Sequence, residues 1–310
     1  MVQKDCIKPK IVCIGGPTGV GKTSLAIKIA KFFNGEIISC DSIAIYSGLN
    51  IGSAKPTDEE QSQAKHYMID IKQPTETFSV AEYRNMAKEL IQDILSRNKL
   101  PIIVGGTGLY MKGLLFPLDL GHTDRNEDIR KKYKAIADKN GGEYLLNYLN
   151  KIDPDSAKKL HPKDLNRIIR ALEIFELTGI KKSDFKTELV SEFDYKLIFL
   201  NDDRTDLYNR IDNRVEKMFT LGLEKEVTEL INNYNLSNKN QSMGGIGYKE
   251  FFEYFDNKIT KDELIDKIKL NSRHYAKRQI TWFKAMPNVC EYNCNNIEKI
   301  LQDVKSFLNE

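Results

Sequence analysis

Residues 16–23 read Gly-Pro-Thr-Gly-Val-Gly-Lys-Thr, a spacing of glycine, lysine and threonine that suits phosphate binding. Glycines let successive backbone N–H groups point at phosphate oxygens, the lysine adds a positive charge, and the threonine hydroxyl can ligate Mg²⁺. An apolar run at 11–14 precedes this phosphate loop, and a helix-like run at 24–30 follows it. We therefore predict a di- or triphosphate site built by Gly16, Thr18, Gly19, Val20, Gly21, Lys22 and Thr23, with Thr23 as metal ligand.

Two further polar groups follow apolar runs of the chain. Asp41 ends the run at 36–40, and Thr107 follows the run at 100–104. Carboxyl ends of parallel strands meet at one edge of a sheet, so both should lie near the phosphate loop. Asp41 could be a general base for a nucleophile, or a cap or an indirect partner of Mg²⁺. Thr107 could bond a phosphate oxygen, cap the following helix, or do both.

Arg210 and Arg214 lie four residues apart in a helix-like segment. Either could clamp a pyrophosphate with two parallel hydrogen bonds, or form an exposed ion pair with a neighbouring carboxylate. An ATP-hydrolysing motor usually carries an acidic residue at the end of such a strand. Here the run at 100–104 is followed by Gly-Gly-Thr instead. The segment 197–202 offers a substitute only after a long insertion, which disfavours ATP hydrolysis.

A second basic set interleaves with aromatic residues near the end of the chain. Arg273, His274, Lys277 and Arg278 share one predicted helix with Tyr275, Trp282 and Phe283. Such a set can grip phosphates and stack on bases. The alternative is a solvated helix face, and the net charge of +3 does not decide between them.

Alternation of apolar strands with helices predicts an α/β fold with a doubly wound parallel sheet. We expect strands at 11–14, 36–42, 68–71, 100–104, 195–200 and 289–292. We expect helices at 79–97 with Ser79 as N-cap and Glu82 as its partner, and at 126–139, 142–151, 164–178, 204–234 with a break near Gly222, 249–255, 262–286 and 296–308. Residues 121–190 are highly charged and lack the apolar runs that indicate strands. We therefore predict a core of 1–120 and 191–310 with a helical insertion at 121–190.

The composition is that of an ordinary globular protein, with 310 residues, 41% of them hydrophobic and 29% charged. No apolar run approaches the roughly 18 residues of a membrane helix, and residues 1–10 lack a signal-peptide core. We therefore expect a cytoplasmic protein without membrane contact. The chain has five cysteines, and this odd number argues against a disulfide framework. Their spacing does not match that of a zinc site. No obligatory protein partner is evident from the sequence.

The chain resembles the bacterial tRNA dimethylallyltransferases, also called tRNA isopentenyltransferases. The matching segments are 16–23, 37–46, 48–56, 66–70, 78–83, 103–110, 166–173, 245–250 and 275–283. The phosphate loop alone is common to many proteins, whereas Asp-Ser-x-x-x-Tyr at 41–46 and Gly-Gly-Thr-x-Leu-Tyr at 105–110 are far more specific. The resemblance implies a P-loop NTPase-like core that carries the insertion.

It also implies transfer of a dimethylallyl group from dimethylallyl diphosphate to N6 of the adenine 3′-adjacent to the anticodon of tRNA, with Mg²⁺ and release of pyrophosphate. Asp41 would accept the N6 proton, and Thr107, Lys22 and Arg214 would orient the pyrophosphate. The implied tRNA contacts are Asp41, Ser42, Ile43, Ala44, Thr107, Arg130, Asn166, Arg167, Ile168, Ile169, Arg170, Gly244, Gly247, Tyr248, Lys249, Lys277 and Arg278. Gly244 departs from many relatives, which carry a polar or basic residue at this position.

Three other functions remain open at this point. An adenylate isopentenyltransferase would perform the same chemistry on free AMP, but it needs neither the insertion nor the basic–aromatic helix. A small-molecule kinase would use ATP with Asp41 as base. A non-catalytic nucleic-acid-binding module would keep the phosphate loop only as structure.

Overall fold

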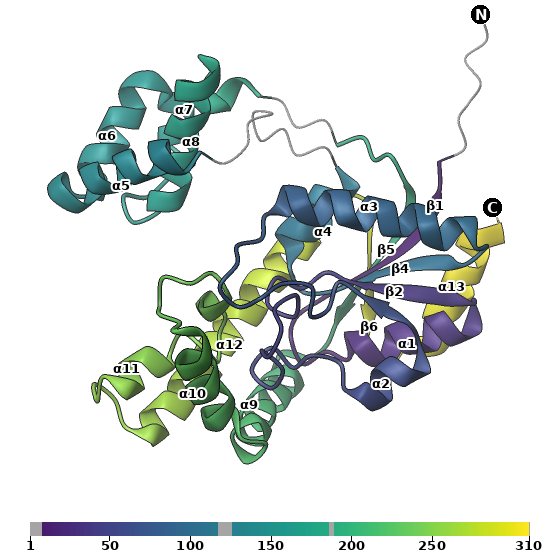
Figure 1. Ribbon diagram of the computed structural model, residues 1–310. Helices are drawn as coiled ribbons and strands as arrows, with labels where there is room; N and C mark the ends of the chain where they lie inside the picture. The colour runs from purple at the N-terminus through teal and green to yellow at the C-terminus, as the bar shows by residue number, and fades with distance from the viewer. Residues whose placement is uncertain (1–7, 117–125, 186–188, 310) are drawn as a thin grey trace, which may run out of the picture. The chain divides into compact units, whose positions relative to one another are not determined.

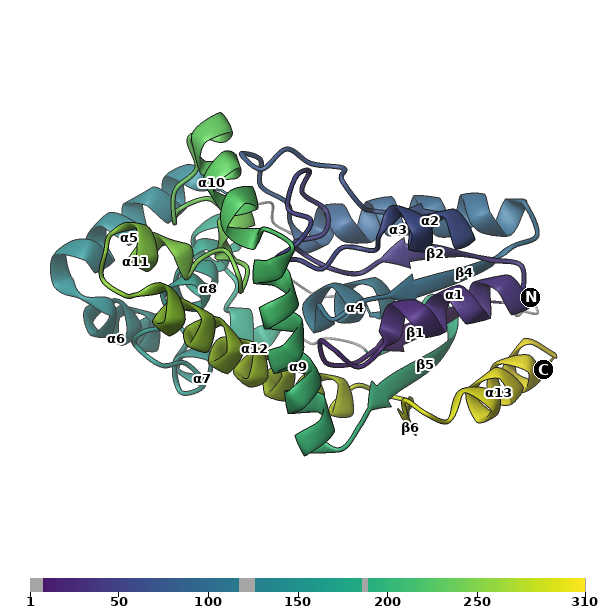
Figure 2. The ribbon, with the colours of Figure 1, turned by 90° about the horizontal axis from the view of Figure 1, so that it is seen from below.

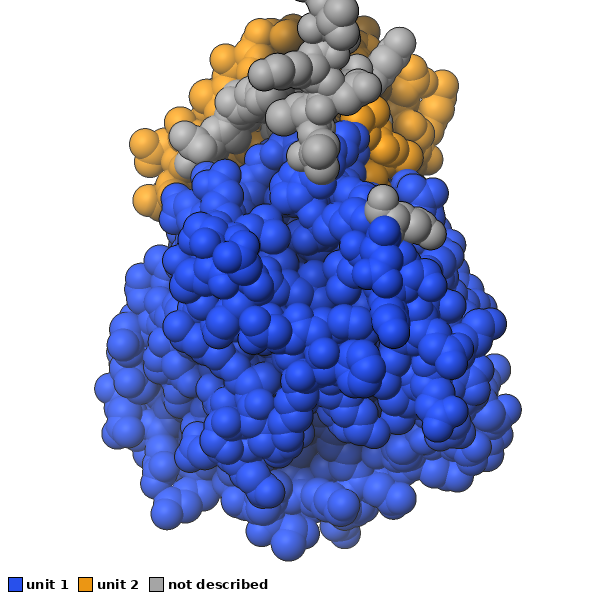
Figure 3. Space-filling view, turned by 90° about the vertical axis from the view of Figure 1, so that its right-hand side faces the viewer, with its two compact units in different colours: residues 1–115, 191–310 blue, residues 116–190 orange. Residues whose placement is uncertain are grey.

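The computed structural model describes residues 8–116, 126–185 and 189–309 (Figure 1). The chain divides into two compact units, which Figure 3 colours separately: unit 1 comprises Met1–Leu115 and Ser191–Glu310, and unit 2 comprises Phe116–Val190. The boundary expected between residues 120 and 121 lies outside the described residues. Cys6 lies outside them as well.

Unit 1 is built on a parallel sheet of six strands, in the order β3-β2-β4-β1-β5-β6. The two central strands, β1 and β4, are almost continuously apolar because helices cover both faces of the sheet. The strands are β1 (Lys10–Gly15), β2 (Gly35–Ser39), β3 (His66–Tyr67), β4 (Leu100–Val104), β5 (Asp194–Asn201) and β6 (Val289–Asn293). The predicted α/β fold with a doubly wound parallel sheet is confirmed.

The strand predicted at 68–71 is wrong. The strand of this region, β3, ends at Tyr67. Met68 and Asp70 then have φ angles of 62° and 54°, in the left-handed region that a strand cannot include. The chain turns here and leaves the sheet.

Helices cover the sheet on two sides. One face carries α3 (Val80–Ser96) and α4 (Gly108–Leu115), and the opposite face carries α1 (Lys22–Phe32) and α13 (Ile297–Asn309) (Figure 1). Side chains of α1 and α13 join those of β1 and β4 in one buried apolar cluster. The predicted start of α3 is confirmed, because Ser79 and Glu82 form a capping box.

Further helices of unit 1 lie beyond the carboxyl ends of the strands (Figure 2). They are α9 (Arg204–Thr220), α10 (Leu223–Tyr234), α11 (Phe251–Phe255) and α12 (Lys261–Lys284). The break predicted near Gly222 is confirmed, since this residue has a φ of 96° between α9 and α10. The short helix α2 (Asp58–Gln63) was not predicted.

In the part that the structure describes, unit 2 is built from helices and their connections and contains no strand. It contains α5 (Glu127–Asn140), α6 (Gly142–Ile152), α7 (Pro154–Ala157) and α8 (Leu165–Thr178). Leu145, Leu149, Ile168 and Leu172 are fully buried in its own apolar core. A helix that could cross a membrane is absent from the described residues of both units.

Candidate active site

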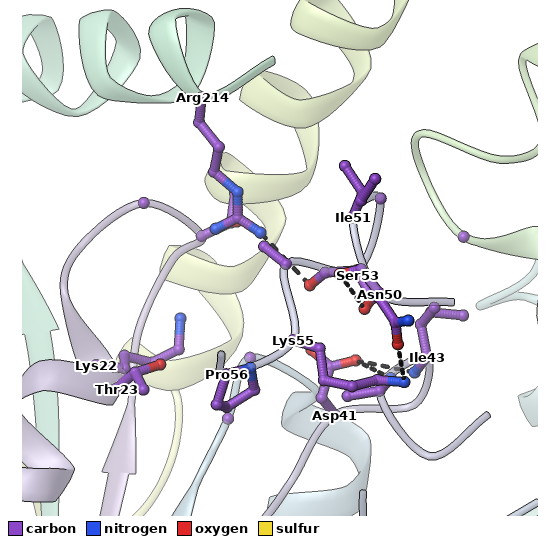
Figure 4. A pocket seen from close by; sticks show the side chains of 18 of the residues that line it. Lys22, Thr23, Asp41, Ile43, Asn50, Ile51, Ser53, Lys55, Pro56 and Arg214 are labelled. Atoms are coloured by element: carbon purple, nitrogen blue, oxygen red, sulfur yellow. Dashed lines mark hydrogen bonds between the residues drawn. The ribbon is translucent and has the colours of Figure 1, made fainter. Parts of the chain in front are cut away.

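A cavity of about 1120 Å³ opens in unit 1 at the carboxyl edge of the sheet. Its walls come from the phosphate loop, Asp41, the segment 50–56, α9 and α12 (Figure 4). The predicted residues Lys22, Thr23 and Arg214 all line it. The cavity therefore brings together residues that are up to 261 positions apart in the sequence, Thr18 and Gln279.

The register of the sheet explains this convergence. Val104 pairs with Ile14 on one side and with Ser39 on the other, so the three strands end level with one another. Just beyond this row, the N–H of Thr107 donates to the carbonyl of Cys40 at 3.2 Å. A Cβ on Gly105 would lie 2.0 Å from the same carbonyl oxygen, so glycine is required for this close approach.

The phosphate loop has the backbone that its glycines allow. Gly19 and Gly21 have φ angles of 79° and 93°, and α1 begins immediately afterwards at Lys22. The N-terminus of α1 thus lies at the cavity, where its free N–H groups favour an anion. Val20 is 3% exposed and its side chain packs in the core, and this residue is not among the described residues that line the cavity.

The ammonium group of Lys22 folds back on the loop. Its Nζ donates to the carbonyls of Gly16 at 3.0 Å and Pro17 at 2.7 Å. Burial, and secondly the charge of Arg214, lower the pKa of Lys22 to about 8, against the opposing effect of Asp41. The three charges therefore lie close enough to influence one another.

Asp41 uses one of its two carboxylate oxygens for local structure. Oδ1 accepts the N–H groups of Ile43 at 2.8 Å and Ala44 at 3.2 Å. Among the described residues, no hydrogen bond engages Oδ2 (Figure 4). The turn-capping role is thus present, and the second oxygen remains available for chemistry in the cavity.

Thr107 connects the ends of β2 and β4. Its Oγ1 accepts the N–H of Ser42 at 3.0 Å and donates to the Ser42 hydroxyl at 3.3 Å. Its carbonyl accepts the N–H groups of Tyr110 and Met111 in the first turn of α4. Thr107 therefore starts a helix and braces Ser42 beside Asp41.

The structure separates the two candidate arginines. Arg214 lines the cavity, where burial lowers the pKa of its guanidinium. Arg210 instead pairs with Asp202 and donates to the carbonyl of Gly19 at 3.1 Å. The hydrogen bond from Arg210 lowers the pKa of Asp202 to about 2. Asp202 was the acidic residue that could have replaced the missing carboxylate of an ATP-hydrolysing motor. In the structure it binds Arg210 instead, and Arg210 in turn holds the phosphate loop through the carbonyl of Gly19.

Gln279 is a structural link that the sequence did not single out. Its Oε1 accepts the N–H of Thr18 at 2.9 Å, and its Nε2 donates to the carbonyl of Gly106 at 3.0 Å. The side chain is 5% exposed, so both bonds are shielded from water. The only signal was its place in the Arg-Gln-Ile-Thr-Trp-Phe segment at 278–283.

Comparison with known proteins identifies the family. The model of the IPP transferase family matches residues 44–286. The tRNA dimethylallyltransferase of Thermoanaerobacter sp. (strain X514) is 46% identical over 308 residues, which cover 96% of this chain and 97% of that protein. The chain belongs to the IPP transferase family.

Solved structures of the IPP transferase family share the fold. The full-length tRNA isopentenylpyrophosphate transferase of Bacillus halodurans matches with a TM-score of 0.74 and 40% identity, covering 97% of each chain. A eukaryotic dimethylallyltransferase acting on tRNA matches with a TM-score of 0.80 and 29% identity, covering 96% of this chain and 77% of that one. The P-loop NTPase-like core is therefore common to this chain and its relatives.

The residues predicted to contact RNA in this IPP transferase differ in exposure, and the half-buried ones are Asp41, Ser42, Ile43, Thr107, Arg130 and Arg170. Asn166, Arg167, Gly244, Lys249, Lys277 and Arg278 are exposed. Ala44, Ile168, Ile169, Gly247 and Tyr248 are buried. The buried side chains at these positions have almost no surface to present to RNA, so a contact here would come through the backbone, and the assignment stays a prediction.

Arg130 and Arg170 of unit 2 share one buried carboxylate. Glu173 is 0% exposed and accepts two bonds of 2.9 Å from Arg130 and one of 2.7 Å from Arg170. Burial alone would raise the pKa of Glu173, but the hydrogen bonds from both arginines bring it below its usual value. Glu173 therefore holds both guanidinium groups in place.

A metal in this IPP transferase would depend on its substrate. Within the described ranges, no three histidine, cysteine or acidic side chains come together to hold an ion. Thr23 lies in the first turn of α1 and lines the cavity. One hydroxyl, phosphate oxygens and water are a donor set that suits Mg²⁺, which keeps several waters in such sites.

Proposed function

We propose that this protein transfers a dimethylallyl group from dimethylallyl diphosphate to N6 of the adenine 3′-adjacent to the anticodon of tRNA. The observation that carries the proposal is that the phosphate loop and Asp41 line the same cavity. Among the described residues, Oδ2 of Asp41 takes part in no hydrogen bond. The names of the relatives support it, because the first is a tRNA dimethylallyltransferase and a structural neighbour acts on tRNA.

The donor diphosphate would occupy the phosphate loop. Backbone N–H groups of 18–23, Lys22 and Arg214 would surround it, and Thr107 would orient it from the end of β4. Thr23 would hold Mg²⁺ together with phosphate oxygens. When bound, this ion would neutralise part of the negative charge on the diphosphate.

The acceptor amine is a weak nucleophile because its lone pair is delocalised into the adenine ring. In the transfer, a bond forms between N6 and the allylic carbon while the bond from that carbon to the diphosphate oxygen breaks. The electron pair of the broken bond leaves with pyrophosphate, and Oδ2 of Asp41 accepts the N6 proton. Lys22 and Arg214 stabilise the charge that develops on the leaving group.

The acceptor base must leave its stack to enter a cavity at the edge of the sheet. The exposed residues Lys249, Lys277 and Arg278 of unit 1, and Asn166 and Arg167 of unit 2, remain our candidates for the RNA surface. A cytoplasmic location stays a prediction, in keeping with a tRNA acceptor.

Binding of the diphosphate should weaken as the pH rises above 8. The pKa of Lys22 is lowered to about 8 in the free protein, and a bound anion would raise it. The full affinity is therefore present below pH 8, and above it each pH unit should cost up to about 10-fold until the pKa of the bound state is reached. Calorimetric titration with dimethylallyl diphosphate between pH 7 and pH 10 checks this. A Lys22→Met variant should bind weakly with no such slope, and a wild-type affinity that stays constant to pH 10 would contradict the prediction.

One incubation tests the proposed function. The protein is mixed with Mg²⁺, labelled dimethylallyl diphosphate and either bulk tRNA or AMP. Label in tRNA is the expected result, whereas label only in AMP would indicate the free-nucleotide enzyme. Consumption of ATP with a small alcohol, and no label in either acceptor, would indicate a kinase instead.

A further inference from the structure

We propose that Glu226 and Tyr248 are positioning residues that hold the segment 50–53 against Arg214. Neither is among the described residues that line the cavity, so both would act through this segment. The proposal rests on the proposed function for its meaning, because Arg214 is the group that would face the leaving pyrophosphate.

Glu226, from α10, binds the backbone of the segment. Its Oε2 accepts the N–H groups of Asn50 at 3.0 Å and Ile51 at 2.8 Å. Its Oε1 accepts the N–H of Gly52 at 3.2 Å. Three successive backbone N–H groups thus converge on one carboxylate, which is the arrangement of an anion-binding nest with the anion supplied by the protein.

Tyr248 completes this set of contacts from the segment that precedes α11. Its hydroxyl donates to Oε1 of Glu226 at 2.8 Å and accepts the N–H of Ser53 at 3.1 Å. Burial and the neighbouring Glu226 raise the pKa of Tyr248 well above its usual value, so the hydroxyl keeps its proton. A Cβ on Gly52 would lie 2.6 Å from the Tyr248 ring, which shows how closely the backbone packs on it.

The far side of the segment faces the cavity. The carbonyl of Ser53 accepts a long contact of 3.5 Å from Nη2 of Arg214 (Figure 4). Lys55 fixes the other end, since its Nζ donates to Oδ1 of Asn50 at 2.8 Å and to the carbonyl of Tyr46 at 3.0 Å. The segment is therefore held on its outer side by Glu226 and Tyr248 and presents Ser53 to Arg214 on its inner side.

Replacing one carboxylate oxygen of Glu226 by an NH₂ group would leave at least one of the three N–H groups without its acceptor. The Ser53 carbonyl would then no longer be fixed, and Arg214 would lose its protein acceptor among the described contacts. Such a defect should weaken use of the diphosphate. It should leave tRNA affinity unchanged, because neither side chain presents itself at the exposed RNA candidates.

Glu226→Gln is the sharpest variant, because it keeps the size of the side chain but places an NH₂ group against backbone N–H donors. We expect the affinity for inorganic pyrophosphate to fall about 10-fold, with tRNA affinity within about 2-fold of wild type. Tyr248→Phe removes one hydroxyl and should show the same pattern at about 3-fold. Glu229→Gln is the matched control on the same helix, since Glu229 is 59% exposed and pairs only with Lys225 among the described charges.

The link to Arg214 is tested by combination. In an Arg214→Lys background, Glu226→Gln should add less than about 2-fold to the loss, because both act on the same contact. Unchanged pyrophosphate affinity in both single variants would overturn the proposal. So would an additive loss in the double variant, or an equal fall in pyrophosphate and tRNA affinity with a lowered melting temperature. Pyrophosphate binding is measured without transfer, so a wild-type protein that fails to prenylate tRNA would refute the proposed function and leave this test intact.

Discussion

Replacing Asp41 by asparagine is expected to slow the transfer about 10²- to 10⁴-fold while tRNA affinity stays within a few-fold of wild type. The amide retains an oxygen for the N–H groups of Ile43 and Ala44, so the turn should keep its shape. It cannot accept the N6 proton. Single-turnover rates with labelled dimethylallyl diphosphate, and filter binding of tRNA, separate the two effects.

Two further variants sharpen this prediction. Asp58→Asn is the control, because Asp58 is an exposed carboxylate on α2 that lines the same cavity. It should transfer at the wild-type rate. Asp41→Ala should also abolish turnover but additionally lose the turn cap. If Asp41→Asn retained turnover and lost tRNA affinity instead, Asp41 would be a recognition residue.

Arg214→Lys should lower kcat/KM for dimethylallyl diphosphate about 10²- to 10³-fold. An ammonium group carries the same charge but cannot offer two parallel N–H donors to a phosphate. Arg214 has the Ser53 carbonyl as a long contact and is otherwise directed at the cavity, so its donors are available to a ligand. The measurement is a steady-state rate series at saturating tRNA.

Arg210→Lys provides the comparison on the same helix. Its guanidinium is already held by Asp202 and the Gly19 carbonyl, so we expect a loss of only about 3- to 10-fold through a looser phosphate loop. A greater loss in Arg210→Lys than in Arg214→Lys would reverse the roles that we give the two residues.

Two of the catalytic candidates, Asp41 and Thr107, could be found from the sequence because each follows an apolar strand. Strand ends converge whatever the details of packing, so Asp41 and Thr107 could be placed near the phosphate loop. The choice between Arg210 and Arg214 could not be made from spacing, since both lie on one side of α9, and only the resemblance to the family indicated Arg214. It depends on Asp202 at the end of β5, which engages one arginine and leaves the other to the cavity.

Supporting residues left no comparable signal. Glu226 binds backbone groups 174 to 176 positions away, and a single carboxylate on a helix carries no pattern that reveals such partners. Ile168 was assigned to the RNA surface only through the resemblance of its segment, whereas the structure buries it on the apolar side of α8. The helix α2 carried a capping box at Thr57 and Glu60, yet it buries no residue, so periodicity could not detect it.

The bond from Gln279 to Thr18 has a consequence for biosynthesis. The two residues are 261 positions apart, so a ribosome adding about 5–20 residues each second completes this contact about 13–50 s after the phosphate loop has been made. The central strand β1 likewise waits for β5 before it gains its second neighbour. A nascent chain therefore carries an unfinished phosphate loop, and the ability to hold a diphosphate should appear late in synthesis, after α12 has emerged.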